Sequence, residues 1–352
     1  MTGLSGLIWA TEEASCRFAA RGPCQLVPIA NEPILFHSLD ALRASGVDEA
    51  VVLVSAETEA PIRRAVANCR RFGLRTTYLR ADGRGEWSEA LRNAANLLGA
   101  RPCIVQHEDG VIRGDLRAHA EEIGRRPSDA LVLVHPPAAG NQVEGMNGRR
   151  LLRLLDPSPT DGLAPTGVCL LGGELLGRLR DGPAPARDGS FGEALARIVD
   201  GSGRLEAREV AGWWRYTASG SALLEANRMV LDDISSDWQG ATCVDSQVQG
   251  RVVAHPSAVL ESTIVRGPAV IGARARVRHS YIGPYTAIGD GARVDGAEIE
   301  SSIILSGAVI RHLGRRLEDS VVGAGTKVHR DFALPTALRV RVGEGQLISL
   351  PY

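Results

Sequence analysis

Six side chains capable of acid, base or nucleophilic chemistry cluster in short stretches of the chain. They are Glu12, Glu13, Cys24, His107, Asp109 and Tyr216. A cysteine beside a histidine can act as a nucleophile with its base, and a carboxylate beside a tyrosine can transfer protons. A catalytic site built from this set is one hypothesis. Each residue alone also fits a structural role, such as a small buried thiol, a turn histidine or a packed ring.

The elements that must position these side chains alternate between strand and helix patterns over about the first 230 residues. Strand-like apolar runs span 4–9, 51–54, 76–79, 103–106 and 130–135, and helical patterns span 31–44, 58–71, 86–98 and 115–124. This alternation predicts a mostly parallel sheet with helices on both faces. Ligands of such sheets bind beyond the carboxyl ends of the strands, so we expect the site in loops 10–22, 81–85 and 107–112.

From about Val244 the pattern changes, and branched aliphatic residues recur at a spacing near six. They are Val253, Val259, Val265, Ile271, Val277, Ile282, Ile288, Val294, Ile299, Ile304, Ile310, Val322 and Val328. Several precede a glycine, which is typical of a left-handed parallel β-helix built from hexapeptide repeats. The predicted fold is therefore a Rossmann-like α/β domain, residues 1–235, followed by a β-helix domain, residues 243–352.

Composition excludes several classes of protein. The 352 residues are 44% hydrophobic, which is enough for folded cores, and 40 basic against 41 acidic side chains leave a formal charge of −1. A balanced charge argues against nucleic acid as a partner. No apolar run approaches the roughly 20 residues that span a bilayer, so no membrane partner is expected. Six scattered cysteines without a CxxC pair favour a reducing cytoplasm.

Motifs along almost the whole chain resemble those of one enzyme family. They span Gln25–Phe36, Gly46–Glu49, Gly212–Arg215, Leu223–Asn227, Val265–Gly272, Ser280–Gly289 and Glu318–Gly323. The chain resembles the long-form glucose-1-phosphate thymidylyltransferases and related sugar-phosphate nucleotidyltransferases. The resemblance implies the reaction of a nucleoside triphosphate with a sugar 1-phosphate, helped by Mg²⁺, and a homo-oligomer assembled with the β-helix. Because fold does not carry function with it, each chemical position is compared separately.

The phosphate-binding devices of that family are altered here. The family has a GGxGTRL loop after its first strand, whereas this chain has Trp9-Ala-Thr-Glu-Glu-Ala14, with Arg17 and Arg21 as the nearest cations. A glutamate about 5 Å from a phosphate charge repels it by about 3 kcal/mol at an effective dielectric constant of 20. The family lysine before the Gln-Leu motif corresponds to Cys24. The lysine of its Glu-Lys-Pro motif falls in Asp156-Pro-Ser158, and the only lysine of the chain is Lys327.

The metal site and the base site also differ from the family pattern. The family holds Mg²⁺ with two aspartates, of which Asp109 is retained in Glu108-Asp-Gly110, while Tyr216 stands at the second position. Asp109 is thus the one candidate metal ligand. In the base-binding segment Gly85 matches a family glycine, but the family glutamine is missing. The candidate ligand-binding residues are Arg17, Gln25, Gly85, Glu108, Thr166, Gly167 and Trp214.

Together these losses favour a nucleotidyltransferase-like protein without metal-dependent nucleotidyl transfer. Its cleft would bind a sugar- or nucleotide-like small molecule or a partner, or perform different chemistry, and no cofactor is expected. Two alternatives stay open. One is a divergent but active enzyme that makes an NDP-sugar and uses Mg²⁺, and the other is a repurposed enzyme that uses the Cys, His, Glu and Tyr groups above. Acyl transfer by a β-helix histidine (His255, His279, His312 or His329) is a more distant possibility.

Overall fold

The α/β part contains one sheet whose strands are mostly parallel. The structure is a computed structural model that describes residues 3–11, 22–67, 72–81, 87–106, 110–112, 116–135, 164–182, 191–199, 203–210, 213–215 and 219–330. Within these ranges seven strands form the order β10-β8-β9-β6-β1-β4-β5. Their bounds are β1 Leu4–Ala10, β4 Val47–Val54, β5 Arg75–Arg80, β6 Cys103–Gln106, β8 Ala130–His135, β9 Ala164–Leu171 and β10 Leu205–Glu209. Only β9 runs antiparallel to its neighbours in this sheet.

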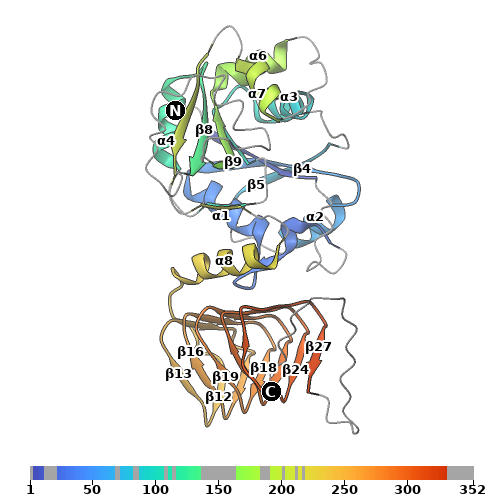
Figure 1. Ribbon diagram of the computed structural model, residues 1–352. Coiled ribbons are helices and arrows are strands. Elements are labelled where there is room, and N and C mark those ends of the chain that lie inside the picture. The colour runs from blue at the N-terminus through green and yellow to red at the C-terminus, as the bar shows by residue number, and fades with distance from the viewer. Residues whose placement is uncertain are drawn as a thin grey trace, which may run out of the picture.

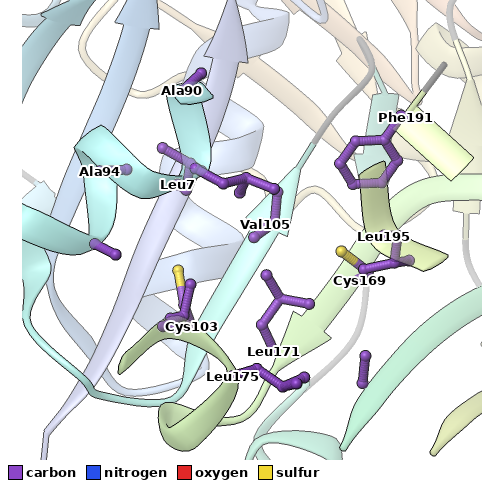
Figure 2. Packing of buried hydrophobic residues seen from close by; sticks show 14 of the residues in the cluster. Leu7, Ala90, Ala94, Cys103, Val105, Cys169, Leu171, Leu175, Phe191 and Leu195 are labelled. Atoms are coloured by element: carbon purple, nitrogen blue, oxygen red, sulfur yellow. The ribbon is translucent and has the colours of Figure 1, made fainter. Parts of the chain in front are cut away.

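Helices cover both faces of this sheet, as the sequence predicts (Figure 1). They are α1 Ile34–Ala44, α2 Glu59–Ala67, α3 Trp87–Leu98, α4 Arg117–Arg125, α6 Gly173–Asp181 and α7 Phe191–Val199. The face covered by α1, α2 and α4 buries Leu39 and Ile123 against strand side chains. The face covered by α3, α6 and α7 buries Leu91 and Leu195 with Leu7 of β1, as Figure 2 shows for part of this cluster. The central strands are apolar on both sides because both sides are buried.

A short hairpin, rather than the first turn of a helix, lies within the Gln25–Phe36 motif. A 3₁₀ turn, η1 Cys24–Leu26, leads into β2 Pro28–Ile29 and β3 Glu32–Pro33. Ala30 and Asn31 form the tip with φ of 48° and 66°. Two consecutive positive φ angles are typical of a type I′ hairpin turn. The helix expected from Asn31 therefore begins only at Ile34 of α1.

The C-terminal part confirms the predicted β-helix, with three parallel sheets made from one strand of each coil. The first sheet holds β12 Thr242–Val244, β15 Val259–Glu261, β18 Arg276–Arg278, β21 Arg293–Asp295, β24 Val309–Arg311 and β27 Lys327–His329. The second holds β13 Gln247–Gln249, β16 Ile264–Arg266, β19 Tyr281–Ile282, β22 Glu298–Glu300 and β25 Leu317–Glu318. The third holds β14 Val252–Ala254, β17 Ala269–Ile271, β20 Thr286–Ile288, β23 Ile303–Ile304 and β26 Val321–Val322.

The repeat register expected for the first two aliphatic positions, Val253 and Val259, is wrong by one residue. Ala254 and Leu260 point into the β-helix core, whereas Val253 and Val259 are only partly buried. From Val265 onward the predicted aliphatic positions are the inward ones. The error arises where two aliphatic residues are neighbours, because either one satisfies a spacing near six.

A single helix, α8 Gly220–Leu231, joins the α/β part to the β-helix and lies between them (Figure 1). Ala226 and Val230 of α8 share one buried cluster with Ile34 of α1 and with Val270 and Ile303 of the third β-helix sheet. α8 ends at Leu231, before the predicted end of the first domain at residue 235, and β12 begins at Thr242, next to the predicted start of the second domain at residue 243. The boundaries at 235 and 243 stay a prediction.

Candidate functional site

The carboxyl ends of the parallel strands meet at one edge of the sheet, where the sequence predicts the site. Ala10 of β1 pairs with Val54 of β4, and Val54 pairs with Arg80 of β5. Thr58 is buried at this edge and its hydroxyl donates to the Ala10 carbonyl at 2.8 Å. The end of β1 is therefore fixed to the start of α2, and the predicted phosphate loop follows from this anchored point.

Many of the predicted site residues lie outside the residues that the structure describes. They are Glu12, Glu13, Arg17, Gly85, His107, Glu108, Asp109 and Tyr216. Their roles stay predictions. The described residues that flank them, together with Cys24, Gln25, Thr166, Gly167 and Trp214, carry the structural argument.

Cys24 is wholly enclosed by apolar neighbours. Its exposed fraction is 0%, and it belongs to the cluster that contains Val27, Ile29 and Leu223 of α8. The 3₁₀ turn η1 holds it there, with the Val27 amide donating to the Cys24 carbonyl at 3.0 Å. The Cys24 side chain is therefore enclosed in this conformation. Its role in the cleft stays a prediction.

Gln25, the next residue, is also buried, but its side-chain oxygen lacks a hydrogen-bond donor among the described residues. It is 2% exposed, and its Oε1 atom has no hydrogen-bond partner among the described residues. A buried acceptor without a partner lowers stability by about 1–3 kcal/mol, and most buried polar groups in proteins therefore have a hydrogen-bond partner. A hydroxyl or an N–H group of a ligand could supply it.

Thr166 and Gly167 serve the fold at the start of β9. The Thr166 hydroxyl donates to the Leu133 carbonyl at 2.9 Å and accepts from the Val168 amide at 3.2 Å. Gly167 has a φ of 73°, and the pairing of β8 with β9 shifts register between Val132 and Val134. The hydrogen bonds of Thr166 account for its burial without a ligand.

A two-stranded ribbon adjoins the candidate metal position. β7 Gly110–Ile112 pairs antiparallel with β11 Trp213–Arg215, so that Gly110 lies opposite Arg215 and Val111 opposite Trp214. The buried Gln106 side chain donates to the Gly110 carbonyl at 3.0 Å. The ribbon thus begins directly after Asp109 in the sequence and ends directly before Tyr216.

An aromatic cluster at the same edge was not predicted. The rings of Trp9 and Trp87 lie 4.2 Å apart, and the rings of Trp87 and Phe191 lie 5.6 Å apart. Trp9 closes β1, Trp87 opens α3 and Phe191 opens α7, so three distant segments meet here. The one signal in the sequence was Trp9, a large ring immediately before the predicted phosphate loop. These three aromatic side chains pack against one another at this end of the sheet.

Buried thiols elsewhere are unsuited to catalysis. Cys103 of β6 and Cys169 of β9 lie in the core shown in Figure 2. Burial raises the pKa of the Cys103 thiol to about 12 and raises the pKa of Cys169 as well. Because the thiolate is the nucleophile, both thiols are unreactive near neutral pH.

The described residues show neither a metal-binding cluster nor a long apolar helix. No group of three or more His, Cys, Asp and Glu side chains there could hold a metal ion. No helix in these ranges is long and apolar enough to cross a membrane.

Comparisons with known proteins point to one family. The family Nucleotidyl transferase matches residues 19–142. Glucose-1-phosphate thymidylyltransferase of Streptomyces antibioticus is 30% identical over 333 residues, with 93% of each chain covered. The Streptomyces griseus protein of the same name is 30% identical over 328 residues, with 91% of each covered. The low-salt glycan biosynthesis nucleotidyltransferase Agl11 of Haloferax volcanii is 27% identical over 339 residues, with 94% covered.

A solved structure shares the fold. It is a Bacillus anthracis protein named as a glucose-1-phosphate thymidylyltransferase, in complex with sucrose, with a TM-score of 0.53 and 18% identity. The match covers 67% of this chain and 98% of that one. At this identity the likeness concerns the arrangement of the backbone.

Proposed function

Since this chain belongs to the glucose-1-phosphate thymidylyltransferase family of sugar-phosphate nucleotidyltransferases, we propose that it binds a sugar- or nucleotide-like small molecule without metal-dependent nucleotidyl transfer. The burial of Cys24 carries this proposal. Where the family resemblance expects a phosphate-contacting lysine, this chain has a 0% exposed thiol among apolar side chains. Burying an ammonium group among these apolar side chains would cost it its hydration.

The cations that the reaction needs are not replaced by another lysine. Phosphoryl transfer depends on positioning and on positive charge that stabilises the transition state. Lys327, the only lysine, lies on β27 in the last described coil of the β-helix. The loop after Ala10 carries Glu12 and Glu13, whose charge opposes a polyphosphate.

The donor set of the candidate metal site does not fit Mg²⁺. The residue that follows β11 is Tyr216, a phenol where the family resemblance expects a carboxylate. Mg²⁺ in nucleotide sites is held by one or two carboxylates together with substrate phosphates. Asp109 alone, next to a loop that disfavours the phosphates, leaves this ion with few ligands.

Ligand binding is supported by the orphaned acceptor of Gln25. Its Oε1 atom is buried and unpaired one residue away from Cys24. A ligand hydroxyl or imino group would satisfy it, and both sugars and pyrimidines offer such donors.

Two alternatives remain, each with its own chemistry. A divergent active transferase would need Arg17, Arg21 and Asp109 to replace the missing groups. A repurposed enzyme would use His107, Glu12, Glu13 and Tyr216, since the enclosed Cys24 is a poor nucleophile. We further propose that the protein is cytoplasmic, which is supported by the described cysteines, none of which forms a disulfide with another described residue. We also propose a homo-oligomer, because another subunit would cover the open ends of the β-helix.

Titration calorimetry with dTTP and Mg²⁺ tests the proposal. We expect no Mg²⁺-dependent binding of dTTP, and a Gln25→Leu variant should weaken any sugar or nucleoside that binds in the cleft. Saturable binding of dTTP that requires Mg²⁺ and disappears in Asp109→Ala would support the active transferase instead. Glu174→Ala, at an exposed position of α6, serves as the control.

A further inference from the structure

A cavity lies away from the sheet edge, between α8 and the β-helix. Its volume is about 540 Å³, which falls within the range of small-molecule sites. The residues that line it include Ser221, Leu224, Glu225 and Arg228 of α8, with Asp319 and Val321 of the β-helix. Figure 1 shows α8 lying along the top of the coils, so that the cavity wall comes from both parts of the chain.

The sequence of α8 divides the helix into two faces. Leu223, Ala226 and Val230 are buried in the shared apolar cluster. Ser221 and Glu225 are four residues apart, as are Leu224 and Arg228, which places them along the side that lines the cavity. The packed face holds the helix in place, and the other face presents its polar groups at fixed positions.

The polar groups around this cavity include both hydrogen-bond donors and hydrogen-bond acceptors. Arg228 donates to the Asp319 carboxylate at 2.9 Å across the junction. Glu225 is exposed and has neither an ion pair nor a hydrogen bond among the described residues. Ser221 adds a hydroxyl that can donate or accept. Leu224 and Val321 are half-buried and add an apolar surface.

We propose that this cavity is a binding site for a neutral, hydroxyl-rich ligand of the size of a sugar. Sugar hydroxyls donate to carboxylates and accept from a guanidinium, and Glu225, Asp319 and Arg228 offer that combination. The C–H face of a sugar ring packs on apolar side chains such as Leu224 and Val321. The lining has two carboxylates and one arginine, so a phosphorylated ligand is repelled.

This site is independent of the cleft chemistry proposed above, because its residues are neither at the sheet edge nor in the family motifs for phosphate and metal. Its failure and the failure of the cleft proposal are therefore distinguishable. The experiment is saturation-transfer NMR on the full-length chain, with glucose as the probe and glucose 1-phosphate as the charged comparison. The variants are Glu225→Ala at the cavity and Gln25→Leu at the cleft.

Glucose should bind the wild-type chain saturably and better than glucose 1-phosphate. Loss of one charge-assisted hydrogen bond in Glu225→Ala should weaken binding about tenfold. The matched surface control Glu174→Ala, at an exposed position of α6, should leave this binding unchanged. Glucose binding that is absent, that is unchanged in Glu225→Ala, or that is lost only in Gln25→Leu would overturn the proposal.

Discussion

Cys24 shows how one residue can decide between two chemistries. Its neighbours Val27, Ile29 and Leu223 form a closed apolar environment, and Gln25 beside it keeps a polar group whose acceptor is unused. The apolar surroundings of Cys24 are the observation on which the proposed loss of phosphate binding rests. This contrast between adjacent residues is invisible in the sequence, because a cysteine can be either a buried apolar residue or a reactive group.

We predict that Cys24→Lys destabilises the protein instead of restoring a phosphate site. A buried charge without a partner costs about 3–5 kcal/mol. Cys24→Ala is the matched control and should cost much less, because only a small apolar group is removed. The free energy of unfolding from urea denaturation, followed by circular dichroism, measures both. A Cys24→Lys protein of wild-type stability with new affinity for dTTP would show that this position opens into the cleft.

At the scale of elements, a network of four charged side chains fixes β10 to the edge of the sheet. Arg126 donates to Glu206 through both terminal nitrogens at 3.0 and 3.2 Å, and Arg208 donates to Glu122 and to Glu206. The hydrogen bond from Arg126 is the main reason that the pKa of Glu206 lies below its ordinary value. β10 thus gains ionic contacts from α4, which compensates for its place at an edge.

We predict a pH-dependent effect of Glu206→Gln. The folded state lowers this pKa below 4.5, so the stabilisation is complete above that pH and is lost as the pH falls through the folded-state pKa. The variant should be less stable by about 1 kcal/mol at pH 7, since partly exposed pairs contribute little. The difference should shrink in acid. Urea denaturation from pH 7 down to pH 3 measures it.

The control for this network is Glu121→Gln. Glu121 neighbours Glu122 on α4 but is exposed and lies 3.6 Å from Arg125. Its substitution should leave stability within a few tenths of a kcal/mol at every pH. An equal effect of the two substitutions, or a Glu206→Gln effect that grows in acid, would contradict the role assigned to this network.

The main strands and helices up to β8 follow from the sequence because each has a strong local pattern, whereas β9, β10 and the helices α6, α7 and α8 were not predicted. β6 and β8 have the predicted bounds, since short apolar runs between polar segments leave little choice. The hairpin tip at Ala30 and Asn31 was missed, because alanine rarely adopts a positive φ and the next residues suit a helix start. The cluster of Trp9, Trp87 and Phe191 was missed because it joins segments that only the folded sheet brings together.

At the scale of the whole molecule, one buried amide ties the two parts of the chain together. Asn227 of α8 is 0% exposed, accepts from the Ala30 amide at 3.0 Å and donates to the Tyr285 carbonyl at 2.9 Å. Asn31 of the same hairpin donates to the Ile288 carbonyl at 2.7 Å. The hairpin that follows Gln25 therefore rests on both α8 and the β-helix.

We predict that Asn227→Ala weakens this junction. The substitution leaves the Ala30 amide and the Tyr285 carbonyl without their partner, and an unsatisfied buried group costs about 1–3 kcal/mol. Asn93→Ala is the matched control, because Asn93 is an exposed helical asparagine on α3. Thermal unfolding should show a lower midpoint for Asn227→Ala alone. Equal midpoints for the two variants would contradict the bridging role of Asn227.

The central claim is that this scaffold has lost the ability to transfer a nucleotide. The most direct measurement is pyrophosphate release by the full-length chain with Mg²⁺, dTTP and glucose 1-phosphate. We predict no release above that of a sample without protein. Pyrophosphate release that rises in proportion to the protein concentration and is abolished by Asp109→Ala would contradict the claim.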